Sequence, residues 1–190
     1  MSLRQLPNTL TVSRMLMVLP LVWLLREGRH VESLWLVFAA GVSDALDGLL
    51  AKRFGWQTRL GSLLDPVADK LLLDACYLGL WAGGHVPTWL AVLVVGRDLL
   101  ILLGATAYHW LVRPLTAVPS LLSKATTLAQ VLLVLAILLH LAWRPMPVAA
   151  LEVATIATGA LTALSGLDYV LRWSLRARRE LQIDRVARRG

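Results

Sequence analysis

Cysteine is almost absent from this 190-residue sequence, because Cys76 is the only one, and a disulfide framework is therefore excluded. Charged residues are also scarce, at 16% of the chain against roughly 25% in an ordinary soluble domain. No internal repeat or low-complexity segment is present. The sequence lacks histidines at metal-ligand spacing, and its four are scattered at His30, His85, His109 and His140. With 57% hydrophobic residues, this composition excludes an ordinary soluble domain and predicts an integral membrane protein.

The sequence consists largely of long apolar segments. Each is close to the roughly 20 residues that a helix needs to cross a bilayer. We therefore predict an all-α integral membrane protein with six transmembrane helices and a first segment that lies partly in the interface. The membrane domain is predicted over 1–175 and a basic tail over 176–190. The predicted spans are 9–26, 32–53, 63–83, 86–112, 121–143 and 148–173.

The basic residues predict the orientation of these spans. An even number of spans places both termini on one side of the membrane, together with the loops near 52–61 and 113–124. That side collects most of the basic residues, including seven arginines between Arg172 and Arg189. Basic residues that flank spans mark the cytoplasmic side. We therefore interpret the basic tail as a solvated segment that sets the orientation, with binding of anionic lipid headgroups as the alternative, and we do not expect nucleic acid as a partner.

Four aspartates gather around the connection between the second and third predicted spans. Asp44 and Asp47 are three residues apart, and Asp65 and Asp69 are four apart, so each pair shares one helix face. An ionised aspartate at membrane depth costs about 2.5 to 3.5 kcal/mol unless a partner offsets it. The connection 52–61 is long enough to reverse the chain, so the two acidic faces are expected to oppose each other. Carboxylates without histidine or thiolate favour Mg²⁺, Mn²⁺ or Ca²⁺ over Zn²⁺.

The same stretch resembles the signature of the CDP-alcohol phosphatidyltransferases, D-x2-D-G-x2-A-R-x8-G-x3-D-x3-D. Every interval is kept, and the single departure is a lysine where the family has arginine. Lysine offers a point charge and arginine a planar fork, so this position would meet the substrate diphosphate differently. The matching residues are Asp44, Asp47, Gly48, Ala51, Lys52, Gly61, Asp65 and Asp69.

The resemblance continues outside this stretch. The segment from Pro7 to Thr11 and Arg14 look like the start of the phosphatidylglycerophosphate synthases and their cardiolipin synthase relatives. Gly96 to Asp98 and Ser123 to Thr127 with Gln130 look like later patches of the same enzymes.

The resemblance implies a six-helix membrane fold, usually homodimeric. With the size of the chain it favours a bacterial inner membrane, with a mitochondrial inner membrane as the alternative. The distribution of basic residues predicts that the active site faces the cytoplasm. It implies transfer of a phosphatidyl group from CDP-diacylglycerol to an alcohol with release of CMP, at a site with two Mg²⁺ or Mn²⁺ ions. Asp44, Asp47 and Asp65 would hold metal, and Asp69 would both ligate metal and act as general base. The CDP-binding positions would be Gly48, Ala51, Lys52 and Gly61.

Two further cations are candidates for binding a phosphate on the acceptor. Arg97 lies inside the fourth predicted span and Lys124 at the start of the fifth, and a cation inside a span suggests function. The alternative for Arg97 is a structural ion pair with Asp98 or Asp74. For Lys124 it is an interfacial lysine whose charge reaches the membrane surface.

Several functions stay open on the sequence alone. Glycerol 3-phosphate as acceptor would give phosphatidylglycerophosphate, and phosphatidylglycerol would give cardiolipin. An inositol or serine acceptor is a further alternative. An ion-coupled transporter would also use acids inside the membrane, but the missing repeat symmetry argues against it.

Overall fold

The structure is a computed structural model. It describes the backbone of 6–54, 59–111, 120–143 and 145–187, and the side chains of 13–43, 70–104, 120–143 and 145–174. Within these ranges the chain forms six α-helices and no strands. The helices are α1 (Leu6–Arg26), α2 (His30–Phe54), α3 (Arg59–Ala82), α4 (Thr88–Leu111), α5 (Leu121–Ala142) and α6 (Val148–Ala187).

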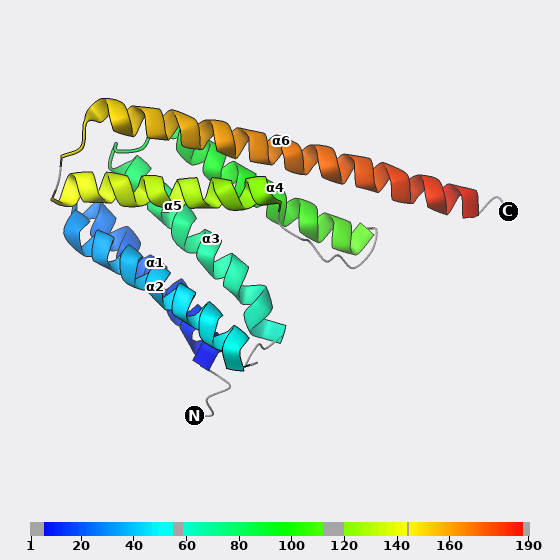
Figure 1. Cartoon of the computed structure of the whole chain (residues 1–190), viewed down its shortest axis with the longest axis horizontal. Helices are drawn as coiled ribbons and strands as arrows, with labels where there is room; N and C mark the ends of the chain where they lie inside the picture. Colours follow the sequence, from blue (N-terminus) through cyan, green and yellow to red (C-terminus); the bar gives the residue numbers. More distant parts are fainter. Residues whose placement is uncertain (1–5, 55–58, 112–119, 144, 188–190) are drawn as a thin grey trace.

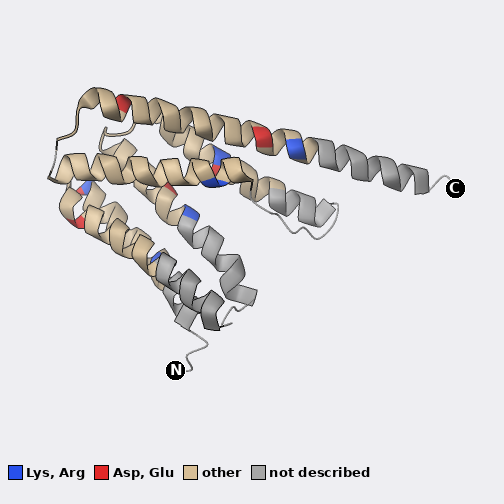
Figure 2. Ribbon diagram, viewed as in Figure 1, with Lys and Arg blue, Asp and Glu red and all other residues tan. Residues whose placement is uncertain are grey.

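The helices form one bundle (Figure 1). Helix α1 packs against α2 and α3, α5 contacts both α2 and α3, and α6 lies along α4 and α5. The core is apolar and continuous, and its fully buried members come from most of these helices: Leu21, Tyr77, Leu90, Val134 and Leu138. Charged residues are few along the described helices (Figure 2).

Hydrogen bonds between helices fix their relative positions. The Tyr77 hydroxyl on α3 donates to the Gln130 carbonyl on α5 at 3.1 Å, and the Gln130 Nε2 donates to the Thr162 hydroxyl on α6 at 3.1 Å. The Tyr169 hydroxyl on α6 donates to the Ile101 carbonyl on α4 at 3.0 Å. Such bonds help to hold membrane helices together because association there has little hydrophobic driving force.

Each of the six predicted apolar segments corresponds to one helix. Two helical stretches of the described residues, Leu121–Ala142 and Val148–Ser174, are long and apolar enough to cross a membrane, and His30–Ser43 is a shorter apolar one. The all-helical fold is therefore confirmed for the described residues. The number of spans stays a prediction.

Helix α6 continues beyond the predicted sixth membrane span. The predicted sixth span ended at 173, but the helix continues to Ala187 and takes in most of the predicted tail 176–190. Arginine, leucine, alanine and glutamate are good helix formers, and no glycine or proline interrupts 167–187. The end of the apolar run therefore did not mark the end of the helix.

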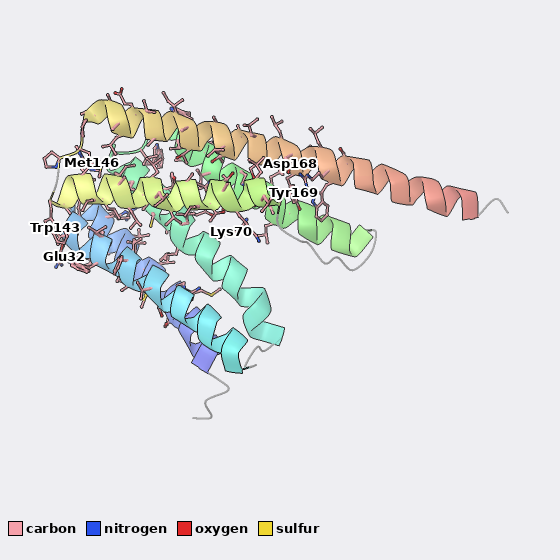
Figure 3. The ribbon with its side chains drawn as sticks, viewed as in Figure 1. Glu32, Lys70, Trp143, Met146, Asp168 and Tyr169 are labelled. Atoms are coloured by element: carbon pink, nitrogen blue, oxygen red, sulfur yellow. The ribbon has the colours of Figure 1, made fainter. Side chains whose placement is uncertain are left out.

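Three of the four histidines meet at the end of the bundle where α2 begins and α5 ends. The His30 and His85 rings are 5.2 Å apart, edge to face. The His140 Nδ1 accepts a hydrogen bond of 2.8 Å from the Met146 backbone N–H, which secures the α5–α6 connection at Met146 (Figure 3). These histidines are far apart in the sequence, as noted above, but three of them lie close together in the fold. Among the described side chains, no group of three His, Cys, Asp or Glu is arranged to hold a metal ion.

This histidine cluster makes stability depend on pH. Burial, followed by the charges of His30 and His140, lowers the pKa of His85, which lies in the turn between α3 and α4. The unfolded chain then binds more protons than the folded one as the pH falls. The thermal unfolding midpoint of the purified protein should therefore fall as the pH is lowered below about 6.5.

The variant His85→Gln should weaken this pH dependence, because glutamine does not titrate. His109→Gln, which changes a histidine near the other end of α4, is the control and should keep the wild-type pH dependence. If the unfolding midpoint of His85→Gln depends on pH as strongly as that of the wild type, His85 is not the source of the pH dependence.

Candidate functional site

The four aspartates of the signature lie on two consecutive helices. Asp44 and Asp47 are on α2, and Asp65 and Asp69 are on α3. Their side chains, with those of Gly48, Ala51, Lys52 and Gly61, lie outside the described residues. The predicted metal and CDP positions therefore stay predictions. The described site begins at the next residue, Lys70.

Arg97 on α4 is at the centre of the described site. It is only 5% exposed, and its guanidinium donates to the neighbouring Asp98 carboxylate. It also donates to the Ser123 hydroxyl on α5 at 2.7 Å and to the Ser165 hydroxyl on α6 at 2.9 Å. These contacts hold the guanidinium in one position where α4, α5 and α6 meet.

Asp98 is shared between two cations. The Lys70 Nζ on α3 donates to the same carboxylate oxygen, at 3.0 Å, that accepts from Arg97. Asp98 is 4% exposed, and two cations offset the cost of burying its charge. Figure 3 labels Lys70 on α3. The shared carboxylate ties α3 to α4.

A cavity of about 570 Å³ opens beside this cluster. Its lining includes charged side chains from α1, α3, α4 and α5 and mostly apolar residues from α2, α3 and α5. The buried Arg97 Nε has no hydrogen-bond partner among the described residues. Arg14 also lines the cavity. Hydrogen bonds join Lys70, Asp98, Arg97 and Ser123, and Lys124 follows Ser123, so these residues form a charged end of the cavity. Such an end suits an anion.

The structure brings the two predicted acceptor residues together. Arg97 and Lys124 line the same cavity, although 26 residues separate Arg97 from the neighbouring Ser123. The structural alternative for Arg97, a pair with Asp98, is also observed, so the pair forms part of the cavity wall. Sequence reasoning missed Lys70 and Ser165. The position of Lys70 directly after Asp69 could have indicated a role in the site. No feature of the sequence around Ser165 indicated one.

Comparisons with known proteins identify the family. Residues 4–165 match the family model described as CDP-alcohol phosphatidyltransferase. The match covers most of the chain, so the protein belongs to the CDP-alcohol phosphatidyltransferase family. The recognition made from the aspartate signature is confirmed.

Curated relatives agree with this assignment. The chain is 36% identical over 174 residues to a probable phosphatidylglycerophosphate synthase of Mycobacterium tuberculosis, covering 88% of this chain and 80% of that protein. It is 31% identical over 182 residues to a probable cardiolipin synthase (CMP-forming) of Drosophila melanogaster, covering 87% of this chain and 56% of that protein. It is also 31% identical over 124 residues to a CDP-diacylglycerol–glycerol-3-phosphate 3-phosphatidyltransferase of Aquifex aeolicus, covering 64% of this chain and 68% of that protein.

The chain is therefore a phosphatidyltransferase and a membrane protein. The predicted transfer to a glycerol-type acceptor agrees with the names of these relatives. The family generally depends on divalent metal ions.

Proposed function

We propose that this protein transfers the phosphatidyl group of CDP-diacylglycerol to a glycerol-type acceptor and releases CMP, in the synthesis of anionic phospholipids. The observation that carries the proposal is the cavity whose charged end joins Lys70, Arg97 and Lys124 directly beyond Asp69 in α3. Membership of the family supports the reaction class, and the cations of this cavity would bind the acceptor's phosphate.

The carboxylate set fits hard divalent ions. Four aspartates lie on two helices joined by a short connection, with no histidine or thiolate among them. Asp44, Asp47, Asp65 and Asp69 would hold two Mg²⁺ or Mn²⁺ ions, which when bound neutralise the donor diphosphate and polarise its phosphorus. Asp69 would also accept the proton of the acceptor hydroxyl as general base.

The residues between the two acidic pairs would bind the CDP part of the donor. Gly48, Ala51 and Gly61 have little or no side chain, so they leave room for a nucleotide beside the helix backbone. Lys52 would contribute a positive charge to the diphosphate without the bidentate geometry of arginine.

We further propose that all six helices cross the inner membrane and that the protein forms a homodimer. The positive-inside tendency places the ends of α2 and α5 that carry Asp47 and Lys124 on the cytoplasmic side. The site then opens to the cytosol, where the nucleotide product is released. The apolar side chains exposed on α4 and α6 suit lipid or a second copy of the chain, among them Val92, Leu103, Val153, Ile156 and Leu167.

Release of CMP by the purified protein tests this function. The protein in detergent or lipid discs, with CDP-diacylglycerol, Mg²⁺ or Mn²⁺ and a glycerol-type acceptor, should form CMP and a new phospholipid together. CMP and product that form with inositol or serine instead would reassign the acceptor. A protein that moves ions across vesicles but releases no CMP would be a transporter, and the proposal would fail.

Lys124→Gln tests the acceptor site without disturbing the fold. Lys124 is exposed, and its side chain makes no hydrogen bond or ion pair with the described residues of the buried network, so the unfolding midpoint should not change. The KM for the acceptor should rise about tenfold, the effect of losing one hydrogen bond to a charged group of roughly 1.5 kcal/mol. The KM for CDP-diacylglycerol should stay the same. An unchanged acceptor KM would leave Lys124 as an interfacial lysine only.

A further inference from the structure

A second cavity lies at the end of the bundle away from the aspartate signature. Its volume is about 430 Å³, and it is bounded by the start of α4, the end of α5 and the start of α6. His140 on α5, Glu152 on α6 and His85 in the turn before α4 line it. The aspartates of the signature lie in the last half of α2 and the first half of α3, towards the opposite end. This cavity is therefore separate from the proposed active site.

Exposed tryptophans indicate that this end of the bundle lies at a membrane surface. Five of the eight lie within five residues of a helix terminus at this end and are 44% to 56% exposed: Trp23, Trp35, Trp81, Trp89 and Trp143. Figure 3 labels Trp143 here, close to Met146 and Glu32. Tryptophan is enriched where lipid headgroups meet the hydrocarbon core. The second cavity therefore lies at the depth of the headgroups.

Glu152 is an unpaired carboxylate in this cavity. It is exposed, and among the described residues it has no hydrogen-bond or ion-pair partner. It lies four residues after Val148, about 6 Å along the axis from the start of α6. A carboxylate so close to the hydrocarbon core is costly unless a cation accompanies it. Glu152 therefore suits a positively charged group of a ligand.

Trp89 offers a second contact for a cation. Its ring lines the cavity and packs directly against Gly159 of α6, where it leaves no room for a Cβ. The face of an indole ring attracts a cation through its quadrupole. Glu152 and Trp89 thus share one preference, although they come from different helices.

His140 supplies a hydrogen-bond donor to the same cavity. Its Nδ1 accepts from the Met146 backbone N–H at 2.8 Å, so in the neutral ring the proton is on Nε2. That N–H can donate to a phosphate oxygen, and His85 adds a second imidazole to the lining. These side chains do not form a metal site, since among the described residues no group of three His, Cys, Asp or Glu is arranged to hold an ion.

The apolar part of the lining is open to the outside of the bundle. Ile156 on α6 lines the cavity and is 64% exposed. On the two helices that bound the cavity, Val92 of α4 and Val153 of α6 are each 66% exposed. Such a surface suits the acyl chains of a lipid and gives no advantage to a water-soluble ligand.

We infer that this cavity binds a phospholipid whose headgroup carries a primary ammonium, phosphatidylethanolamine, in the leaflet opposite to the proposed active site. The ammonium contacts Glu152 and Trp89, the phosphate accepts a hydrogen bond from His140, and an acyl chain lies against Ile156. Phosphatidylglycerol has no cation for the carboxylate. The quaternary ammonium of phosphatidylcholine cannot donate a hydrogen bond to it. The inference rests on the cavity and on membrane placement, so its test does not measure transfer activity.

Lipid titrations of the purified full-length protein test the inference. Delipidated protein in non-ionic detergent receives dioleoyl phosphatidylethanolamine, phosphatidylglycerol or phosphatidylcholine, and native mass spectrometry measures the apparent Kd of each. Phosphatidylethanolamine should bind at least about tenfold more tightly than the other two, the effect of one hydrogen bond to a charged group. Water-soluble glycerophosphoethanolamine should bind at least about tenfold more weakly than the lipid, because it lacks acyl chains. Equal Kd values in either comparison would overturn the inference.

Glu152→Gln removes the charge and keeps the shape of the side chain. It should weaken phosphatidylethanolamine binding at least about tenfold and leave the unfolding midpoint of the lipid-free protein unchanged. The matched control is Glu32→Gln, since Glu32 is an exposed carboxylate at the same end that pairs with Arg29 at 2.8 Å and does not line the cavity. Exposed ion pairs contribute little, so this variant should bind the lipid as the wild type does. Equal losses in both variants, or no loss in Glu152→Gln, would contradict the site.

Ile156→Cys distinguishes a lipid from a second copy of the chain. The native Cys76 is buried, so oxidation in lipid vesicles reports on the new thiol alone. Few disulfide-linked dimers should form if lipid covers the cavity. Efficient linkage at this position would show that a second copy covers it, and the inference would fail.

Discussion

Asp69→Asn is expected to reduce CMP release from CDP-diacylglycerol by about 10³-fold or more, since general base catalysis alone contributes 10²- to 10⁴-fold. Asparagine keeps the size of the side chain but removes the charge that a divalent ion needs and the oxygen that accepts the proton. Asp69 lies in α3, one residue before Lys70 at the charged end of the cavity. The measurement is the rate of CMP formation at saturating metal and acceptor.

The control for this experiment is a carboxylate outside the site. Asp168 on α6 pairs with Arg172 at 2.6 Å, and Arg172 is well exposed. Asp168→Asn should keep near wild-type CMP release, because exposed ion pairs contribute little. Both variants should have similar unfolding midpoints. An Asp69→Asn protein within tenfold of wild type would remove Asp69 from the role of base.

Arg97→Ala is expected to cost both stability and acceptor binding. The guanidinium donates hydrogen bonds to Asp98, Ser123 and Ser165. Its loss leaves the buried Asp98 carboxylate with Lys70 as its one cation partner among the described side chains. Removing one partner of a buried ion pair costs about 3 kcal/mol or more. The unfolding midpoint should fall clearly, and the acceptor KM should rise in whatever protein remains folded.

Two further variants separate charge from shape in this effect. Arg97→Lys keeps the charge but cannot make all three contacts at once, so it should recover only part of the stability. The double variant Arg97→Ala with Asp98→Ala should be less destabilised than the sum of the two single variants, because it leaves no unpaired buried charge. Additive losses would show that Arg97 and Asp98 do not depend on each other.

The fold was predictable wherever one local signal controlled it. Apolar runs separated by Gly83, Gly84 and Pro87, or by Pro145 and Pro147, gave helices close to those observed. The predicted sixth span, 148–173, agrees with the apolar stretch Val148–Ser174, but helix α6 continues to Ala187 because hydropathy falls after Trp173 while helix propensity does not. Crossing a membrane and forming a helix are different properties, and the hydropathy of the sequence predicts only the first.

The site was predictable only in part, because packing decides which distant residues meet. Charges inside apolar runs identified Arg97 and Lys124, and the structure places both on one cavity. Ser165 is 68 residues from Arg97 along the chain, and nothing in its local sequence distinguishes it from other small residues on α6. The meeting of His30 and His85 likewise depends on how the ends of the helices pack. The roles of the four aspartates were predicted from their spacing and the family signature, and they stay predictions because their side chains lie outside the described residues.

The unbroken length of α6 has a mechanical consequence. Ser165, which accepts a hydrogen bond from Arg97, lies on the same helix as the arginine-rich segment beyond 175. Apart from Gly166 beside it, neither glycine nor proline lies between Ser165 and Ala187 to absorb bending. A membrane surface or a bound protein that displaced the C-terminal end of α6 would therefore also displace the Ser165 hydroxyl, which accepts a hydrogen bond from the Arg97 guanidinium.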